Sequence, residues 1–192
     1  MSSQNTEVPK FLIDQFIVLV GLMGAGKTNL GMRIASLLGL PFFDTDLEIE
    51  KAAGCTISEI FKSFGEKQFR EGERRVISRL LNEKPGVIAS GGGSFMDVRT
   101  RNLISKKGIS IWLRADLELL YRRTIRRTHR PLLNNDNPRE TLIRLMEERH
   151  IVYEKADIIF DVTDIPPNKS AKLLIKTLNN YGSDNRKVVP DK

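Results

Sequence analysis

Short apolar runs alternate with longer segments of helical periodicity along the middle of this chain. Five runs rich in β-branched and aromatic residues predict strands at Phe16–Val20, Pro41–Phe43, Gly86–Ala89, Ile109–Leu113 and Asp157–Phe160. Each run is almost wholly apolar, which is typical of a parallel sheet covered on both faces. The alternation of strands with helices predicts a three-layer α/β/α fold with a five-stranded parallel sheet and right-handed crossovers.

The segments between these runs carry apolar residues at the spacing of helices. The positions that carry this pattern are Leu30, Ile34, Leu37 and Leu38, then Phe69, Val76, Ile77, Leu80 and Leu81, and later Leu142, Leu145, Met146 and Tyr153. The second group belongs to a long helix that we expect to open at Gly65. The ends of the chain are polar and aperiodic, so we expect flexible tails at 1–14 and 182–192 around a single domain, 15–181.

Composition narrows the class of protein. The chain has 192 residues, 40% of them hydrophobic, which is enough for one core and too few for two. The apolar run Phe16–Val20 is too short to span a bilayer, and no secretory signal opens the chain. A single cysteine, Cys55, excludes an intrachain disulfide and fits a reducing compartment. We therefore expect a cytoplasmic protein without a membrane partner.

The net charge of +7 suits a polyanionic ligand, which includes nucleotide phosphates, nucleic acid and a membrane surface. Arginines concentrate between Arg114 and Arg130. A solvated helix face is the ordinary explanation of such a run. The segment 122–137 continues into the turn-prone residues 134–138, so it also has the composition of a mobile lid that would bring positive charge to a phosphoryl group and exclude water.

A phosphate-binding motif follows the first predicted strand. Residues Gly21–Thr28 match G-x-x-x-x-G-K-[ST], with an apolar strand before them and an amphipathic helix after them. Glycines let the backbone N–H groups wrap a phosphate at a helix N-terminus. Lys27 supplies a charge for the β- and γ-phosphates, and the Thr28 hydroxyl is a ligand for Mg²⁺. The motif indicates a nucleoside triphosphate site but not which reaction uses it.

Two carboxylates, Asp44 and Asp46, end the second predicted strand, where ligands bind in such sheets. Residues two apart on an extended segment point the same way, so both could face the ligand. One carboxylate would support Mg²⁺ and the other would accept a proton from a substrate hydroxyl. The alternative is that Asp46 caps a helix starting near Leu47.

Three further features suit an anionic substrate. Arg70 has Glu73 one helical turn away, which would orient the guanidinium toward a carboxylate, although a surface ion pair is the simpler explanation. The run Gly91–Gly93 invites close approach of a ligand to bare backbone, or is an ordinary flexible turn. Arg149 lies on the apolar stripe of its helix and needs an anionic partner, either internal or a bound substrate.

These motifs, in this order, resemble the shikimate kinase family over about residues 15–178. The resemblance rests jointly on G-x-M-G-A-G-K-T, D-T-D, G-E-x-x-F-R, S-G-G-G-S, R-P-L-L and R-x-x-x-Y. It implies transfer of the γ-phosphoryl group of ATP to the 3-hydroxyl of shikimate, with Mg²⁺, by a monomer of the shikimate pathway, which leads to aromatic amino acids.

The resemblance also implies a role for individual residues. The catalytic residues would be Lys27, Asp46 and Arg130, the last from the lid. The metal ligands would be Thr28 and Asp44. ATP would be bound by Gly24, Ala25, Gly26, Lys27, Thr28, Asn29, Arg123, Arg130 and Lys169, with Arg123 stacked on adenine. Shikimate would be bound by Asp46, Arg70, Gly91, Gly92, Gly93 and Arg149.

Two other functions remain open from the sequence. A gluconate-type kinase would share the fold and take another polyol acid, although the Arg70, triple-glycine and Arg149 set favours a carboxylate with ring hydroxyls. A regulatory nucleotide switch or nucleic-acid-dependent NTPase would use the basic segment for binding. Against this second alternative, we find no separate nucleic-acid module and no stacking aromatic residues among the arginines, so we expect no nucleic-acid partner.

Overall fold

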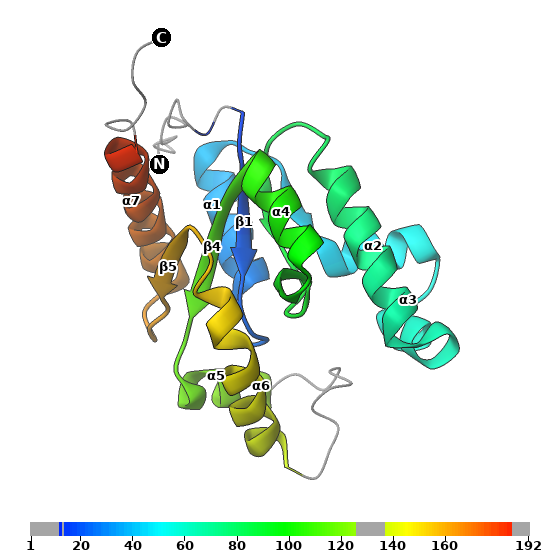
Figure 1. Cartoon of the computed structure of the whole chain (residues 1–192). Coiled ribbons are helices and arrows are strands. Elements are labelled where there is room, and N and C mark those ends of the chain that lie inside the picture. Colours follow the sequence, from blue (N-terminus) through cyan, green and yellow to red (C-terminus); the bar gives the residue numbers. More distant parts are fainter. Residues whose placement is uncertain (1–11, 13, 126–136, 186–192) are drawn as a thin grey trace.

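Five parallel strands form the centre of the molecule (Figure 1). The structure is a computed structural model that describes residues 12, 14–125 and 137–185. Across the sheet the strands follow the order β2-β3-β1-β4-β5. Their bounds are β1 Phe16–Val20, β2 Phe42–Asp44, β3 Val87–Ala89, β4 Gly108–Arg114 and β5 Ile158–Asp161. The predicted five-stranded parallel sheet is confirmed, and the end of each strand lies within one residue of its predicted position.

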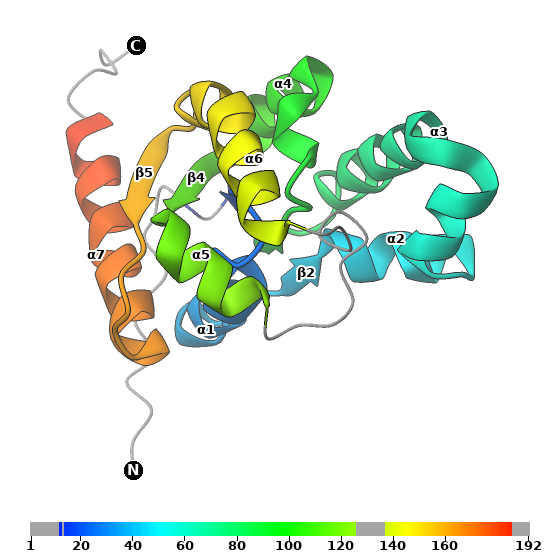
Figure 2. The same cartoon turned by 90° about the horizontal axis from the view of Figure 1, so that it is seen from below.

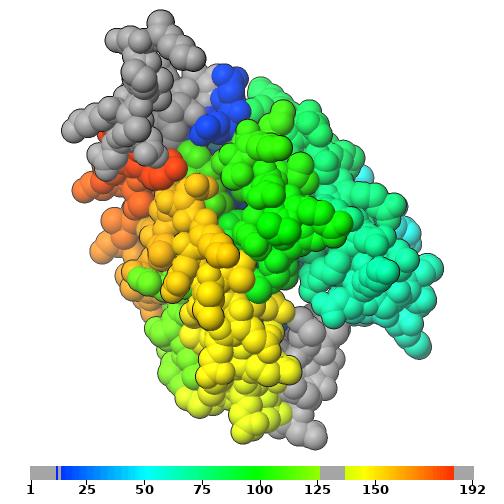
Figure 3. Space-filling model, viewed as in Figure 1, coloured from blue at the N-terminus to red at the C-terminus, as the bar shows by residue number. Residues whose placement is uncertain are grey.

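Helices cover both faces of this sheet, so that the molecule has three layers (Figure 2). Helices α1 and α7 pack together on one face, while α4 packs on β4 and β1 from the other face beside α6. In the space-filling view, α4 and α6 hide most of the sheet on the side that faces the reader (Figure 3). The helices are α1 Lys27–Leu38, α2 Thr45–Ala53, α3 Ile57–Leu80, α4 Val98–Lys107, α5 Leu117–Thr124, α6 Pro138–Tyr153 and α7 Pro167–Asn185, with a short 3₁₀ turn, η2, at Ser94–Met96.

Burial on both faces explains why the strands read as continuous apolar runs. Every residue of β1 is buried, and Ile17 and Leu19, like Ile88 of β3 and Ile111 of β4, have no exposed surface. Apolar side chains on two faces of a sheet require two covering layers, because each face must be removed from water. Within the described residues, no helix combines the length and the apolar content needed to cross a bilayer.

Side-chain caps fix where several helices begin. Thr56 and Glu59 form a reciprocal capping box at the start of α3. Asp97 caps α4 by accepting from the amides of Arg99 and Thr100. Burial alone would raise the pKa of Asp97, but hydrogen bonds from the Arg99 side chain and from these amides outweigh it and lower the pKa to about 2.

Three boundaries differ from the sequence-based predictions. Leu12, assigned to a flexible tail, is fully buried in the core. Residues 182–185, also assigned to a tail, continue helix α7. The helix expected to open at Gly65 begins earlier, at Ile57, and Gly65 interrupts it with φ 76° and ψ 173°. Of the expected lid, 126–136 lie outside the described residues.

Candidate functional site

The phosphate loop connects β1, the central strand, to α1. Gly26 precedes the helix with φ 94°, a left-handed conformation that glycine adopts without strain. As the N-cap, Gly26 has no side chain to bond the first amides of α1. The Lys27 ammonium lies back over the loop, where Nζ donates to the carbonyl oxygens of Gly21 at 2.7 Å and Leu22 at 3.0 Å. Bare amides at a helix N-terminus with a lysine beside them make a binding site for phosphate.

Helix α5 packs directly on this loop. A Cβ built on Gly24 would lie 2.7 Å from Thr124 Oγ1, so no side chain fits at that position. A Cβ built on Gly26 would lie 3.7 Å from Arg123 Nη1. The other terminal nitrogen of Arg123, Nη2, lies 3.9 Å from a carboxylate oxygen of Asp164. The other expected nucleotide residues, Asn29 in α1 and Lys169 in the first turn of α7, are exposed. Arg130 lies outside the described residues.

Asp44 connects the phosphate loop to the next strand. The Thr28 hydroxyl donates to Asp44 Oδ2 at 2.7 Å, and Asp44 Oδ1 accepts from the amide of Asp46 at 3.0 Å. Asp44 is therefore the N-cap of α2, which begins at Thr45. The alternative that Asp46 caps a helix starting near Leu47 is wrong, because Asp46 lies inside the first turn. The hydroxyl of Thr28 and the carboxylate of Asp44 bring two oxygen ligands together, the kind that Mg²⁺ prefers.

The triple glycine is not an ordinary flexible turn, because hydrogen bonds fix most of its backbone groups. The Gly91 amide donates to Thr45 Oγ1 at 2.8 Å, and the carbonyls of Gly91 and Gly93 accept from the amides of Ser94 and Met96. The Gly92 carbonyl accepts from two side chains of α6. Among the described residues, no group accepts from the amides of Gly92 and Gly93, so two N–H groups remain to bind a ligand.

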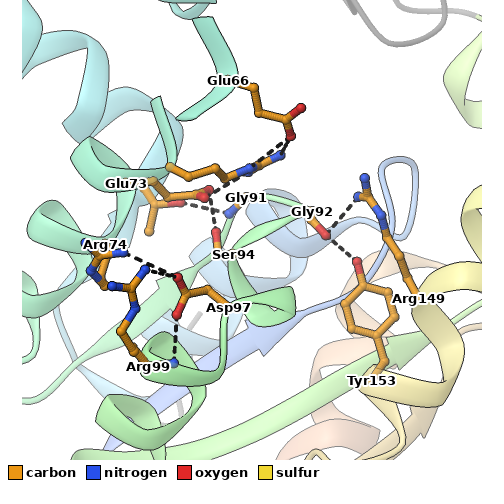
Figure 4. A network of polar contacts seen from close by, with 12 residues as sticks. Glu66, Glu73, Arg74, Gly91, Gly92, Ser94, Asp97, Arg99, Arg149 and Tyr153 are labelled. Carbon is orange, nitrogen blue, oxygen red and sulfur yellow. Dashed lines mark hydrogen bonds and ion pairs between the residues drawn. The ribbon is translucent and has the colours of Figure 1, made fainter. Parts of the chain in front are cut away.

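Arg70 lies against this loop and is held by two carboxylates. Its Nη1 donates to Glu73 at 2.8 Å, and its Nη2 lies 3.2 Å from Glu66. Burial has the largest single effect on the pKa of the Arg70 guanidinium and lowers it, but attraction and hydrogen bonds to Glu73 and Glu66 together outweigh burial, so the pKa is raised. Glu73 is only 3% exposed and also accepts from Ser94 at 2.6 Å, so the arrangement is more than a surface ion pair (Figure 4). A Cβ built on Gly93 would lie 2.5 Å from Arg70 Nη1.

Arg149 approaches the loop from the other side, on α6. Its Nη1 donates to the Gly92 carbonyl at 3.1 Å, and the Tyr153 hydroxyl donates to the same oxygen (Figure 4). The internal partner of Arg149 is therefore a neutral carbonyl, and within the described ranges no carboxylate forms an ion pair with it. Arg70 and Arg149 thus flank the two remaining glycine amides.

The structure also identifies residues that the sequence did not single out for the site. Thr45 accepts a hydrogen bond from the Gly91 amide, and Tyr153 donates one to the Gly92 carbonyl. Glu66 accepts from Arg70, and Ser94 donates to Glu73. The position of Thr45 between two aspartates at a strand end was a usable signal. Within the described ranges, no group of three or more His, Cys, Asp or Glu side chains could hold a metal ion by itself.

The site combines a phosphate loop after the central strand, two carboxylates where β2 meets α2, and a glycine loop flanked by two arginines. Together these features define a P-loop kinase of small anionic metabolites. Comparison with known proteins identifies the family. The shikimate kinase family model matches residues 23–179, and the chain belongs to that family. It is an ATP-dependent phosphotransferase that acts on the shikimate hydroxyl.

The similarity extends over nearly the whole chain. The shikimate kinase of Paramagnetospirillum magneticum is 53% identical over 169 residues, which are 88% of this chain and 87% of the relative. That of Rhodopseudomonas palustris is 47% identical over 180 residues, covering 94% and 89%. A solved shikimate kinase from Acinetobacter baumannii in complex with shikimate has a TM-score of 0.85 at 36% identity, covering 88% of this chain and 96% of that one.

A gluconokinase from Sinorhizobium meliloti also shares the architecture, with a TM-score of 0.56 at 21% identity, covering 89% of this chain and 98% of that one. At that identity the likeness concerns the fold alone.

Proposed function

We propose that the protein binds the shikimate carboxylate between Arg70, Arg149 and the amides of Gly92 and Gly93, and phosphorylates the 3-hydroxyl with ATP to give shikimate 3-phosphate and ADP. The observation that carries this proposal is the pair of glycine amides without an acceptor among the described residues, flanked by two guanidinium groups. A carboxylate satisfies all four groups with charge-assisted hydrogen bonds. The product belongs to the shikimate pathway.

The three glycines have different roles in this proposal. The amide of Gly91 already donates to Thr45, so Gly91 serves by its lack of a side chain and not as a donor. A Cβ there would lie 2.6 Å from Glu73 Oε1 and 3.0 Å from Asp46 Oδ1. Gly91 therefore lets Asp46 approach the carboxylate receptor closely. We assign Asp46 to the shikimate hydroxyls, where its carboxylate positions the reacting group and accepts its proton.

The nucleotide half of the site uses the first turn of α1. Residues 24–29 surround the phosphates with their backbone. The Ala25 amide, which donates to the Leu22 carbonyl at 3.2 Å, and the Lys27 ammonium both turn from loop carbonyls to the nucleotide, with Lys27 at the β- and γ-phosphates. Arg123, which lies beside the phosphate loop, stacks on adenine. Lys169, exposed at the start of α7, contributes to nucleotide binding.

Magnesium fits the pair Thr28 and Asp44, whose oxygens are 2.7 Å apart. A metal ion that keeps several waters needs only one or two protein oxygens in addition to the phosphates. Bound Mg²⁺ would neutralise charge on the β- and γ-phosphates. Asp44 at the end of β2 and Thr28 in the first turn of α1 would hold it beside the phosphate loop.

Residues 122–137 form the lid in this proposal, with Arg130 as the group that reaches the transferring phosphoryl. Support comes from the arginine density and from α5, whose residues Leu120 and Thr124 pack on Gly24 of the phosphate loop just before this segment in the sequence. Closure would exclude water, which otherwise competes with the substrate hydroxyl. We further propose a cytoplasmic monomer without nucleic-acid or membrane partners, which gel filtration with light scattering and an RNA-binding assay can test.

A coupled ADP-release assay tests the activity, run with shikimate and with gluconate, each with and without RNA. We expect turnover with shikimate, little with gluconate and no effect of RNA. Turnover with gluconate alone would support the gluconate-type kinase, and RNA-stimulated hydrolysis without either acid would support the nucleic-acid-dependent NTPase.

Arg149→Ala separates substrate binding from nucleotide binding. The variant should weaken shikimate binding by about 2–5 kcal/mol, because a charged hydrogen-bonded group is lost. ADP affinity should stay nearly unchanged, as measured by calorimetry. A variant that merely unfolds would instead assign Arg149 to the folding of the glycine loop, through its bond to Gly92.

A further inference from the structure

The Gly92 carbonyl is held by two donors from one helix. Arg149 and Tyr153 are one turn apart on α6, and both point at this oxygen (Figure 4). A carbonyl oxygen has two lone pairs, so it accepts both bonds at once. Arg149 cannot keep its full bond to the carbonyl and also pair with a substrate carboxylate through the same N–H group. When Arg149 turns to a substrate, Tyr153 is the second donor that stays on the Gly92 carbonyl.

Burial and ring packing hold the Tyr153 side chain in a position to donate to Gly92. It has no exposed surface, and its ring packs against Trp112, Phe95 and His150 at centroid distances of 5.8, 6.4 and 6.5 Å. Burial raises the pKa of the Tyr153 hydroxyl to about 12, against the opposite effect of the neighbouring Arg149. The phenol is therefore protonated at neutral pH and can always donate to Gly92.

The orientation of one peptide depends on this bond. The peptide between Gly92 and Gly93 is planar and trans, so its carbonyl and its N–H group point in opposite directions. When Tyr153 fixes the Gly92 carbonyl toward α6, the Gly93 amide is turned away from α6. Gly93 lies against the guanidinium of Arg70. In the proposed carboxylate receptor, Arg70 is the second cation beside Arg149.

The other anchors of the loop do not control this peptide. Thr45 binds the amide of Gly91, and the Ser90 amide and hydroxyl both donate to Leu19. On the far side, the Gly93 carbonyl accepts from Met96. Glycine allows rotation on either side of a peptide, so a loop fixed only at these ends could still flip the peptide between Gly92 and Gly93.

We propose that Tyr153 is a positioning residue for shikimate: its hydroxyl holds the Gly92 carbonyl so that the Gly93 amide stays directed at the substrate carboxylate while Arg149 turns from the carbonyl to the substrate. This inference rests on the proposed function of the site. Tyr153 acts through the glycine loop and does not itself touch the substrate. It would therefore affect recognition of the carboxylate and leave the nucleotide half unchanged.

The test is Tyr153→Phe, which keeps the ring packing and removes only the donor. The variant removes the buried hydrogen bond from Tyr153 to the Gly92 carbonyl. The KM for shikimate should therefore rise about 5- to 50-fold. The KM for ATP should change less than about twofold, because the Tyr153 hydroxyl bonds to the Gly92 carbonyl and not to the phosphate loop. A shikimate analogue with a hydroxymethyl group in place of the carboxylate should show no further loss in the variant. Tyr181→Phe, on α7, which packs against α1, is the matched control and should leave the KM for shikimate unchanged.

Each outcome decides the inference. An unchanged KM for shikimate overturns it, and so does an equal loss with shikimate, the analogue and ATP, which would indicate a general structural role. Restoring a donor with 4-aminophenylalanine at position 153 should recover most of the affinity. If Tyr153→Phe does not fold, 4-fluorophenylalanine at the same position fills the space of the hydroxyl and gives the same comparison. A wild-type protein that neither binds nor phosphorylates shikimate would refute the proposed function itself.

Discussion

Gly93→Ala tests the carboxylate receptor without truncating any of its side chains. The added methyl group would lie 2.5–2.6 Å from three atoms of the Arg70 guanidinium, well inside van der Waals contact. The backbone of Gly93, with φ −98° and ψ −14°, is open to alanine, so the strain falls on Arg70 alone. The guanidinium is the end of a long side chain and can move aside.

This geometry predicts a loss of substrate affinity without a loss of stability. Displacement of Arg70 removes a charged hydrogen bond worth about 1.5–3 kcal/mol, so the KM for shikimate should rise about 10- to 150-fold. The free energy of unfolding should stay within about 1 kcal/mol of wild type, because alanine also lowers the entropy of the unfolded chain. Steady-state kinetics with both substrates and urea unfolding measure the two quantities.

Gly72→Ala is the matched control, because it lies in α3 only two residues from Arg70 and a Cβ there meets nothing within 4 Å. It should leave the kinetics unchanged and stabilise the helix by about 0.5–1 kcal/mol. If Gly93→Ala binds shikimate as tightly as the wild-type protein, Arg70 is not part of the receptor. If it loses several kcal/mol of stability, the methyl group met a rigid neighbour and the reasoning from the flexible guanidinium is wrong.

Three further predictions concern the phosphate loop, the lid and acid stability. Lys27→Ala should nearly abolish turnover in the ADP-release assay, because its charge is needed most as the bond to the γ-phosphoryl group breaks. Arg130→Ala should lower kcat far more than it raises the KM for shikimate, and residues 122–137 should gain protection from amide exchange when both ligands bind. Asp97→Asn should be less stable than the wild-type protein by about 1 kcal/mol at pH 7, after allowance for solvent screening of the Asp97 carboxylate. Because the pKa of Asp97 is lowered to about 2, this difference should be present above pH 4 and disappear as the pH falls toward 2.

Each of these predictions has a contrary result. Wild-type kcat in Lys27→Ala would overturn the kinase assignment of the loop. Ligand-independent exchange over 122–137, together with normal kcat in Arg130→Ala, would leave the arginines as a solvated charge run. If the difference in the free energy of unfolding between Asp97→Asn and the wild-type protein stayed constant from pH 7 to pH 2, Asp97 would stabilise α4 by its shape and not by its charge.

The features that could be predicted from the sequence are those that depend on residues close together along the chain. The strands were recognisable because burial on both faces forces continuous apolar runs, as in Phe16–Val20. The phosphate loop is a single contiguous segment, and the pair of Arg70 and Glu73 depends only on helical spacing. Such features need no knowledge of how distant segments are placed.

The parts that the sequence missed depend on contacts between distant segments. The bond from Gly91 to Thr45 joins residues 46 positions apart, and that from Tyr153 to Gly92 spans 61 positions. Apart from the place of Thr45 between two aspartates, no local pattern around these residues indicates the contact. The start of α2 was misplaced for another reason: Leu47 suggested the first apolar helical position, but it is 63% exposed, and the cap at Asp44 decides where the helix begins.

The break at Gly65 divides α3 into two parts that the backbone can orient separately. Its φ of 76° and ψ of 173° lie in a region that is essentially restricted to glycine, and an added Cβ there would meet nothing within 4 Å. Helix α2 packs against α3 beside the edge of the sheet at β2, apart from the strand that bears the phosphate loop (Figure 2). Residues 57–64 therefore join the part of α3 that carries Arg70 and Glu73 through a single flexible point. A change of angle at Gly65 would move the first part of α3 and leave the ion pair of Arg70 and Glu73 in place.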